Sequence, residues 1–161
     1  EEVSDVERGK LMALATKATL GKNLMAALQN KGTDGALAFC NERAYPLTDS
    51  VAQLKNARIK RVSDKNRNPQ NAANADELAY IQQAKAQLAS GEEIAPFFVA
   101  DGLKRGFYPI LTNQMCMQCH GQPQTDIAPS TMALISDLYP ADKAVGYGVN
   151  ELRGIWVVEW E

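Results

Sequence analysis

The segment Pro96-Phe97-Phe98-Val99-Ala100-Asp101-Gly102-Leu103, continued by residues 104–112, contains the clearest fold signal in this chain. Asp101-Gly102 is typical of a tight β-hairpin turn, because glycine tolerates the positive φ that such turns require. Runs rich in aromatic and β-branched residues lie on both sides of it. The segment therefore predicts an antiparallel hairpin, and Leu152 to Trp160 supplies another β-rich run for the same sheet.

Three further elements are predicted along the chain. Ala57–Ser63 is short and combines β-branched residues with alternating charge, which indicates a strand. Asn74 and Glu77 form a capping-box pattern, so a helix is expected to begin there and to end at Gly91. Residues 129–140 are bounded by two prolines, the first at a typical first-turn position, and predict another helix.

Two helices are predicted ahead of the sheet. From residue 3 to about residue 29, apolar residues recur at spacings of three, four or seven, as on one face of a helix. This stripe consists of Val3, Val6, Leu11, Leu14, Ala18, Met25 and Leu28. Gly32 is expected to end this helix and Asp34 to cap the next. The second stripe consists of Leu37, Cys40, Ala44, Leu47, Val51 and Leu54, so Cys40 is expected to face inward.

Helices packed on an antiparallel sheet define the α+β class. The length of 161 residues suits one domain, with a helical N-terminal part (1–56) and a sheet part (57–161). A hydrophobic fraction of 45% and a charged fraction of 22% are ordinary for a folded globular chain.

Charge and hydropathy exclude several kinds of partner. The formal net charge is -2, so no strong positive field is expected to attract nucleic acid or anionic lipids. No apolar run approaches the roughly 20 residues that a membrane span requires. The acidic start, residues 1–5, differs from the basic start of a signal peptide, and we expect a mature or trimmed chain.

Cys116-Met117-Gln118-Cys119-His120 matches the Cys-x-x-Cys-His signature of c-type haem attachment. In such proteins both thiols form thioethers with the haem vinyl groups, and the adjacent histidine ligates the iron. The motif predicts one covalent haem c, held by Cys116 and Cys119, with His120 as the proximal iron ligand. Because this attachment needs an oxidising compartment, we expect a periplasmic or otherwise extracytoplasmic protein.

Three alternatives compete with this interpretation: a thioredoxin-like redox pair, half of a zinc site, and a chance pattern. A zinc site needs about four ligands, and outside the motif the chain has only Cys40 and no second histidine. A redox Cys-x-x-Cys normally opens a helix after a buried strand of a βαβ unit, whereas this one follows a hairpin strand. Haem attachment is the favoured interpretation.

The second axial position on the iron has several candidates, and bis-histidine ligation is excluded because His120 is the only histidine. The candidates are Cys40, Met12, Met25, Met115, Met117, Met132, a lysine, or an open site for a gas or water. Cys40 is our choice, because an unpaired cysteine in an oxidising compartment suggests that its sulfur is engaged. The simpler alternative is a small buried hydrophobic residue.

Basic and aromatic residues supply candidates for the haem surroundings. Arg58, Arg61 and Arg67 are candidates for neutralising the haem propionates, with a solvated basic face as the alternative. Tyr108, Tyr139 and Tyr147 combine an apolar ring with a polar tip and are candidates for the haem edge, with core packing as the simpler explanation.

Several segments together resemble a family of single-haem c-type domains with a PAS-like fold, found as free cytochromes and as extracytoplasmic sensor domains of chemoreceptors and histidine kinases. The segments are Cys40, residues 61–63 and 67–71 with Glu77, residues 115–121, residues 138–144, Gly146 and residues 153–154. The resemblance implies an antiparallel sheet that cradles the haem, with helices around it. It also implies a cysteine as sixth ligand, which in this chain is Cys40.

Two functions follow from this reading. The first is a redox or diatomic-gas sensor, in which loss of the Cys40 bond moves the helix that carries it. The second is an electron carrier with an unidentified redox partner protein. Peroxidase-like catalysis is disfavoured because no distal histidine exists, so we expect no enzymatic activity. A signalling partner, if one exists, is not identifiable from the sequence.

Overall fold

The computed structural model describes residues 2–161 and contains four helices and four strands in that range. The helices are α1 (Asp5–Leu54), α2 (Ala75–Ala89), α3 (Met117–His120) and α4 (Pro129–Leu138). The strands are β1 (Arg58–Val62), β2 (Phe97–Asp101), β3 (Leu103–Leu111) and β4 (Leu152–Trp160). Short 3₁₀ turns span Pro69–Asn71 and Gln114–Cys116. This content confirms the predicted α+β class and is consistent with a PAS-like fold.

The four strands form one antiparallel sheet in the order β1-β4-β3-β2. The predicted hairpin is β2 and β3, which turn at Gly102 with a φ of 79°. The predicted last strand is β4, and it lies in the middle of the sheet between β1 and β3. The strand expected at 57–63 is β1. Turn chemistry and β-rich composition therefore located every strand.

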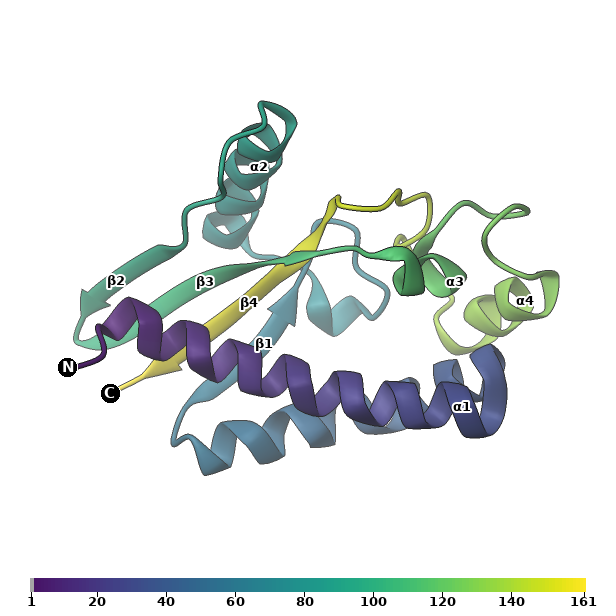
Figure 1. The fold of residues 1–161 in the computed structure, drawn as a ribbon, viewed down its shortest axis with the longest axis horizontal. Helices are drawn as coiled ribbons and strands as arrows, with labels where there is room; N and C mark the ends of the chain where they lie inside the picture. The colour runs from purple at the N-terminus through teal and green to yellow at the C-terminus, as the bar shows by residue number, and fades with distance from the viewer. Residues whose placement is uncertain (1) are drawn as a thin grey trace.

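Strand β4 is buried on both faces and separates two hydrophobic clusters. On one face Trp156, Val158 and Trp160 pack against α1. On the other face Ile155 and Val157 pack against α2. Figure 1 shows α1 crossing one side of the sheet, while α2 lies on the other side. The capping box that predicted α2 is formed, since Asn74 and Glu77 each bond the other's backbone N–H.

Helix α1 consists of two helical segments that meet at Gly32, as predicted. Gly32 has a φ of 70° and is the one residue inside α1 with non-helical dihedral angles. Asp34, expected to cap the second segment, accepts a hydrogen bond from the Thr131 hydroxyl of α4 at 2.5 Å. Thr33 donates to the side chain of Gln118 in α3 at 2.7 Å. These bonds tie the start of the second segment to the end of the molecule opposite the two termini (Figure 1).

The apolar stripe predicted for the first helix is wrong. Leu11, Leu14 and Met25 are 42–50% exposed, while Gly9 and Thr16 are buried with Met12 and Ala13. Small residues on this face let α1 lie close to the aromatic rings of β3 and β4, and such close packing outweighs the burial of larger side chains elsewhere. Leu54, assigned to the second stripe, is also exposed.

Within residues 2–161, no helix has both the length and the apolar character that crossing a membrane requires.

Candidate functional site

The Cys-x-x-Cys-His motif forms a compact helical turn directly after β3. Asn113 caps it, since its Oδ1 accepts a hydrogen bond from the backbone N–H of Cys116 at 3.3 Å. The turn closes when the N–H of Gly121 donates to the carbonyl of Met117 at 2.9 Å. A Cβ atom on Gly121 would lie 2.6 Å from that carbonyl oxygen, so only glycine fits the close approach.

A cavity of about 290 Å³ brings the motif together with Cys40. Cys116, Cys119 and His120 line it, and so does Cys40, which comes from a different element 76 residues before the motif. The surface of the cavity is largely apolar, with apolar side chains from both segments of α1, from β1 and from β3, although about half of the other lining residues are polar, among them Arg153 of β4. A largely apolar cavity with a few convergent polar groups is the usual form of a cofactor site.

The hydrogen bond at Nδ1 of His120 determines which nitrogen of the ring is free. Nδ1 lies 2.8 Å from the carbonyl oxygen of Ala144, which can only accept, so Nδ1 carries the proton and Nε2 carries a lone pair. Burial lowers the pKa of His120 well below its usual value, and the charges of Arg153 and Arg67 act in the same direction. The imidazole is therefore neutral and able to ligate a metal through Nε2.

Arg67 stabilises the motif through hydrogen bonds to backbone carbonyl oxygens. Its Nη2 donates to the carbonyl oxygens of Cys119 at 2.6 Å and Ala144 at 3.1 Å. Its Nε forms a buried ion pair with Asp142 at 2.9 Å, and Asp142 also accepts from the N–H of Ala144 at 3.0 Å. Arg67 lines the cavity, but most of its hydrogen-bonding capacity is used within the protein.

Two other arginines line the cavity without a carboxylate partner. Arg61 has no ion pair among the described residues, and its guanidinium lies 5.7 Å from the ring centroid of Trp156. Arg153 donates to the neutral oxygens of Ser63 at 3.0 Å and Lys65 at 3.2 Å. No Asp or Glu lines this cavity within residues 2–161. The side chains that line the cavity therefore favour the binding of a negatively charged group.

The cysteines of the cavity are free thiols in the structure. Burial raises the pKa of Cys40, and the nearby charge of Arg61 acts in the opposite direction. Burial likewise raises the pKa of Cys119, opposed by the charge of Arg67. In the described part of the chain, no group of three His, Cys, Asp or Glu side chains is arranged to hold a metal ion, so the zinc alternative gains no geometric support.

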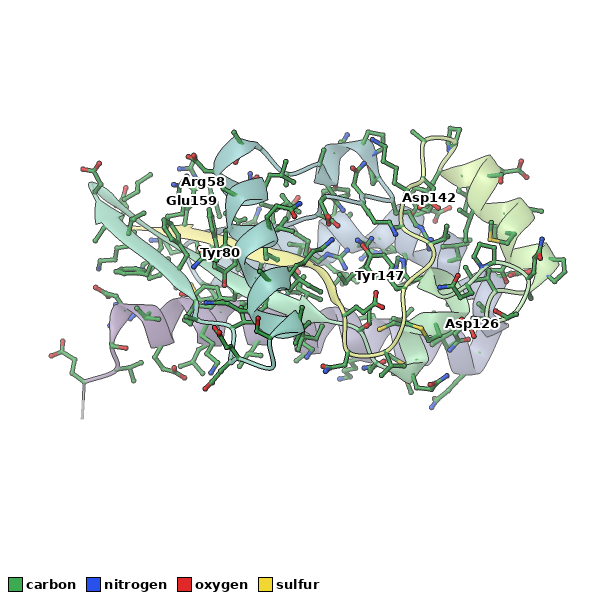
Figure 2. All side chains as sticks on the ribbon, turned by 90° about the horizontal axis from the view of Figure 1, so that it is seen from above. Arg58, Tyr80, Asp126, Asp142, Tyr147 and Glu159 are labelled. Carbon is green, nitrogen blue, oxygen red and sulfur yellow. The ribbon has the colours of Figure 1, made fainter. Side chains whose placement is uncertain are left out.

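The structure separates the remaining candidates. Tyr139 lines the cavity, and Tyr147 lies edge-on to His120 with ring centroids 6.3 Å apart. Tyr108 is not a lining residue, because its hydroxyl donates to the carbonyl of Val6 at 2.9 Å within the core between α1 and the sheet. Arg58 is exposed and pairs with Glu159, and Figure 2 shows this pair well away from Asp142 and Tyr147.

Among the methionines considered as iron ligands, Met115 lines the cavity. Met12 is buried between α1 and the sheet, and Met117, inside the motif, is buried with Ala144 and Tyr147. Met25 is exposed, and Met132 packs against the cluster between α4 and α1.

The chain matches the model of the Tll0287-like family over residues 3–160. The chain belongs to this family. Among solved structures it resembles the crystal structure of the cyanobacterial haem protein Tll0287, with 22% sequence identity and a TM-score of 0.67. The match covers 97% of this chain and 95% of that chain, and it supports a shared fold. No curated protein matches the chain.

Several residues that line the cavity were not predicted from the sequence. Only the family resemblance points to Arg153, although this residue is a cation in a strand whose other residues are mostly apolar. Leu24 and Leu28 also line the cavity, and their spacing of four is the available signal that they share a helix face. Asn41, next to Cys40, carries no sequence signal that distinguishes it from a surface residue.

Proposed function

We propose that this chain binds one haem c, attached through Cys116 and Cys119, with His120 as the proximal iron ligand. The observation that carries the proposal is that these three residues and Cys40 line a single cavity. Attachment would join each thiol sulfur to one carbon of a vinyl group, and the thiol hydrogen would go to the other carbon. A bound haem would supply an iron that changes oxidation state or binds a diatomic ligand.

The residues present fit such a group in three respects. The His120 ring directs its proton to a backbone carbonyl, as metal-ligating histidines commonly do, which leaves Nε2 free. Arg61 and Arg153 are cations without carboxylate partners, which suits the two propionates of a haem. The apolar part of the lining suits a porphyrin face.

Cys40 is proposed as the second axial ligand. It reaches the same cavity from α1, and the charge of Arg61 favours its thiolate form, although burial acts against it. Met115 also lines the cavity, but it immediately precedes Cys116, so we expect the attachment turn to hold it on the side of His120. The ligand pair would then be His120 and Cys40, from elements far apart in sequence.

We propose that the protein acts as an extracytoplasmic sensor of redox state or of a diatomic gas, without enzymatic activity. Cys40 lies on the second segment of α1, which joins the first at Gly32 and contacts α3 and α4 through Thr33 and Asp34. Loss of the Cys40 bond would remove one of the contacts that hold this segment, and the joint at Gly32 would allow it to shift. Because the proposed iron ligand Cys40 lies on a helix with a joint, binding and release of its sulfur would give the two conformational states that a sensor needs.

Electron transfer is the alternative function, and the cavity's opening to solvent would give a partner access to a haem edge. Binding of carbon monoxide to the reduced protein at neutral pH distinguishes the two. A sensor with a labile Cys40 bond should bind carbon monoxide within the mixing time. A reduced protein that keeps its spectrum for minutes under carbon monoxide would favour the carrier.

A further inference from the structure

The exposed face of the first segment of α1 is strongly basic in a chain whose net charge is -2. Residues 8–33 contain five of the 17 basic residues and none of the 19 acidic residues. The basic residues are Arg8, Lys10, Lys17, Lys22 and Lys31, and all of them are exposed. None forms an ion pair with any residue between 2 and 161. This positive charge is therefore available to a partner.

An apolar stripe runs along the same face. Leu11, Leu14 and Met25 are 50%, 45% and 42% exposed, and Ala18 between them is exposed as well. Their spacings of three, four and seven align them on one side of the helix over about 20 Å. Single exposed leucines are common on protein surfaces, whereas these four residues share one side of a helix.

The basic residues border the stripe on both sides. Lys10 and Lys17 lie seven residues apart on one edge, and Lys22 lies on the other edge, as the helical period of 3.6 residues requires. A stripe of apolar side chains with lysines along both edges is the arrangement of helices that lie in a membrane interface. There the apolar groups enter the acyl boundary, and the lysines extend toward lipid phosphates.

We propose that this face of α1, defined by Leu11, Leu14, Ala18, Met25 and the bordering lysines, binds the surface of a membrane that contains anionic lipid. The negative headgroups complement the positive charge, and the flat bilayer surface suits the straight stripe. Leu24 and Leu28 line the cavity from a neighbouring face of the same helix, so binding would hold the cavity beside the membrane. The inference does not depend on haem attachment.

Vesicle co-sedimentation tests the proposal with the full chain. Vesicles of phosphatidylcholine and phosphatidylglycerol in equal parts should bind the protein, and vesicles of phosphatidylcholine alone should not. Binding should weaken when salt rises from about 0.1 M to about 1 M, because the screening length falls from about 10 Å to about 3 Å. Absence of binding to the anionic vesicles at the lower salt would overturn the proposal.

Two matched charge variants locate the surface. The triple variant Lys10→Gln, Lys17→Gln, Lys22→Gln should lower the affinity for anionic vesicles about 10-fold or more. The control Arg43→Gln, Lys55→Gln, Arg58→Gln removes the same charge from exposed positions elsewhere and should retain wild-type binding. An equal loss in both variants would show that net charge, and not this face, governs binding, and would contradict the proposal.

The apolar contribution is tested by Leu11→Ser with Leu14→Ser. This variant should also lose binding, while its circular dichroism stays that of the wild type because neither side chain belongs to the buried core. Unchanged binding would contradict an interfacial helix. Binding of the wild type to immobilised polyglutamate, together with no binding to anionic vesicles, would overturn the lipid proposal in favour of an acidic protein partner.

Discussion

The Nδ1–H of His120 donates to the carbonyl oxygen of Ala144 at 2.8 Å, and Arg67 donates to the same oxygen. Ala144 is itself held by Asp142, which accepts its N–H. The His120 backbone carbonyl in turn accepts from the N–H of Tyr147 at 2.9 Å. The loop 142–147 therefore holds both the ring and the backbone of the residue that we propose as iron ligand. This loop sets the orientation of the imidazole before any cofactor binds.

Arg67→Gln should lower the free energy of unfolding by about 3 kcal/mol, because it leaves the Asp142 carboxylate buried without its charge partner. Urea denaturation followed by circular dichroism measures this change. Arg58→Gln is the matched control, since Arg58 is 73% exposed in its pair with Glu159 and should cost less than about 1 kcal/mol. Similar losses in the two variants would show that Arg67 is not a structural support of the motif.

Gly9→Ala should destabilise the fold by about 2 kcal/mol, because α1 lies too close to the sheet for a side chain at this position. The new Cβ atom would overlap the Tyr108 hydroxyl and lie 2.7 Å from the Trp160 ring. Gly21→Ala on the same helix has no atom within 4 Å of the new Cβ and should stabilise by about 0.8 kcal/mol. Thermal denaturation of both variants checks these opposite signs, and a shift of the same sign in both would refute the packing argument.

Tyr108 makes stability sensitive to alkaline pH. Burial, with a smaller effect of the Glu7 carboxylate, raises the pKa of Tyr108 from 10.0 to about 12. The fold favours the neutral phenol, so this stabilisation is complete below about pH 10 and is lost as the pH rises toward about 12. Tyr80, whose pKa burial also raises to about 12, acts in the same way.

Tyr108→Phe should therefore reduce the loss of stability between pH 9 and pH 12, and Tyr80→Phe combined with it should reduce that loss further. At neutral pH the single variant should lose about 1 kcal/mol with the hydrogen bond to the Val6 carbonyl. Urea denaturation across this pH range measures both effects. A pH dependence unchanged in the double variant would exclude these tyrosines as its source.

Cys40→Ser should raise the midpoint potential of the haem-loaded protein and convert the oxidised spectrum to a high-spin form. The physical reason is that a thiolate stabilises ferric over ferrous iron, and serine removes this donor at nearly constant volume. Potentiometric titration monitored by absorption measures the shift. Met115→Leu, at a second cavity position, is the control and should leave both properties unchanged. If Met115→Leu changed the potential and the spectrum while Cys40→Ser left both unchanged, the ligand would be Met115 and not Cys40.

The strands were predictable because their signals are local. Asp101-Gly102 determines the hairpin through the positive φ of one residue, and Asn74 with Glu77 determines the start of α2 through two hydrogen bonds.

The burial pattern of α1 was not predictable in this way. The buried face of α1 is determined by the packing of Gly9 and Ala13 against aromatic rings of distant strands. The pattern of hydrophobic residues along the helix does not contain this information.

The cavity was predicted in part for a similar reason. The short motif gave Cys116, Cys119 and His120 from spacing alone, and the inward face of the second segment placed Cys40 in the same cavity. Charge in the sequence did not reveal which arginines stay free. Arg67 bonds the backbone of the motif, whereas Arg61 and Arg153 remain without carboxylates, and this difference depends on Asp142, 75 residues away from Arg67.

Covalent attachment of haem is the central claim, and acid-organic extraction followed by a denaturing gel stained for haem peroxidase activity tests it most directly. The account predicts that the purified protein keeps its haem in the aqueous fraction and on the polypeptide band, because two thioethers hold it independently of folding. Cys116→Ala with Cys119→Ala should lose that band. Release of free haem into the organic phase by the wild-type protein would contradict the account.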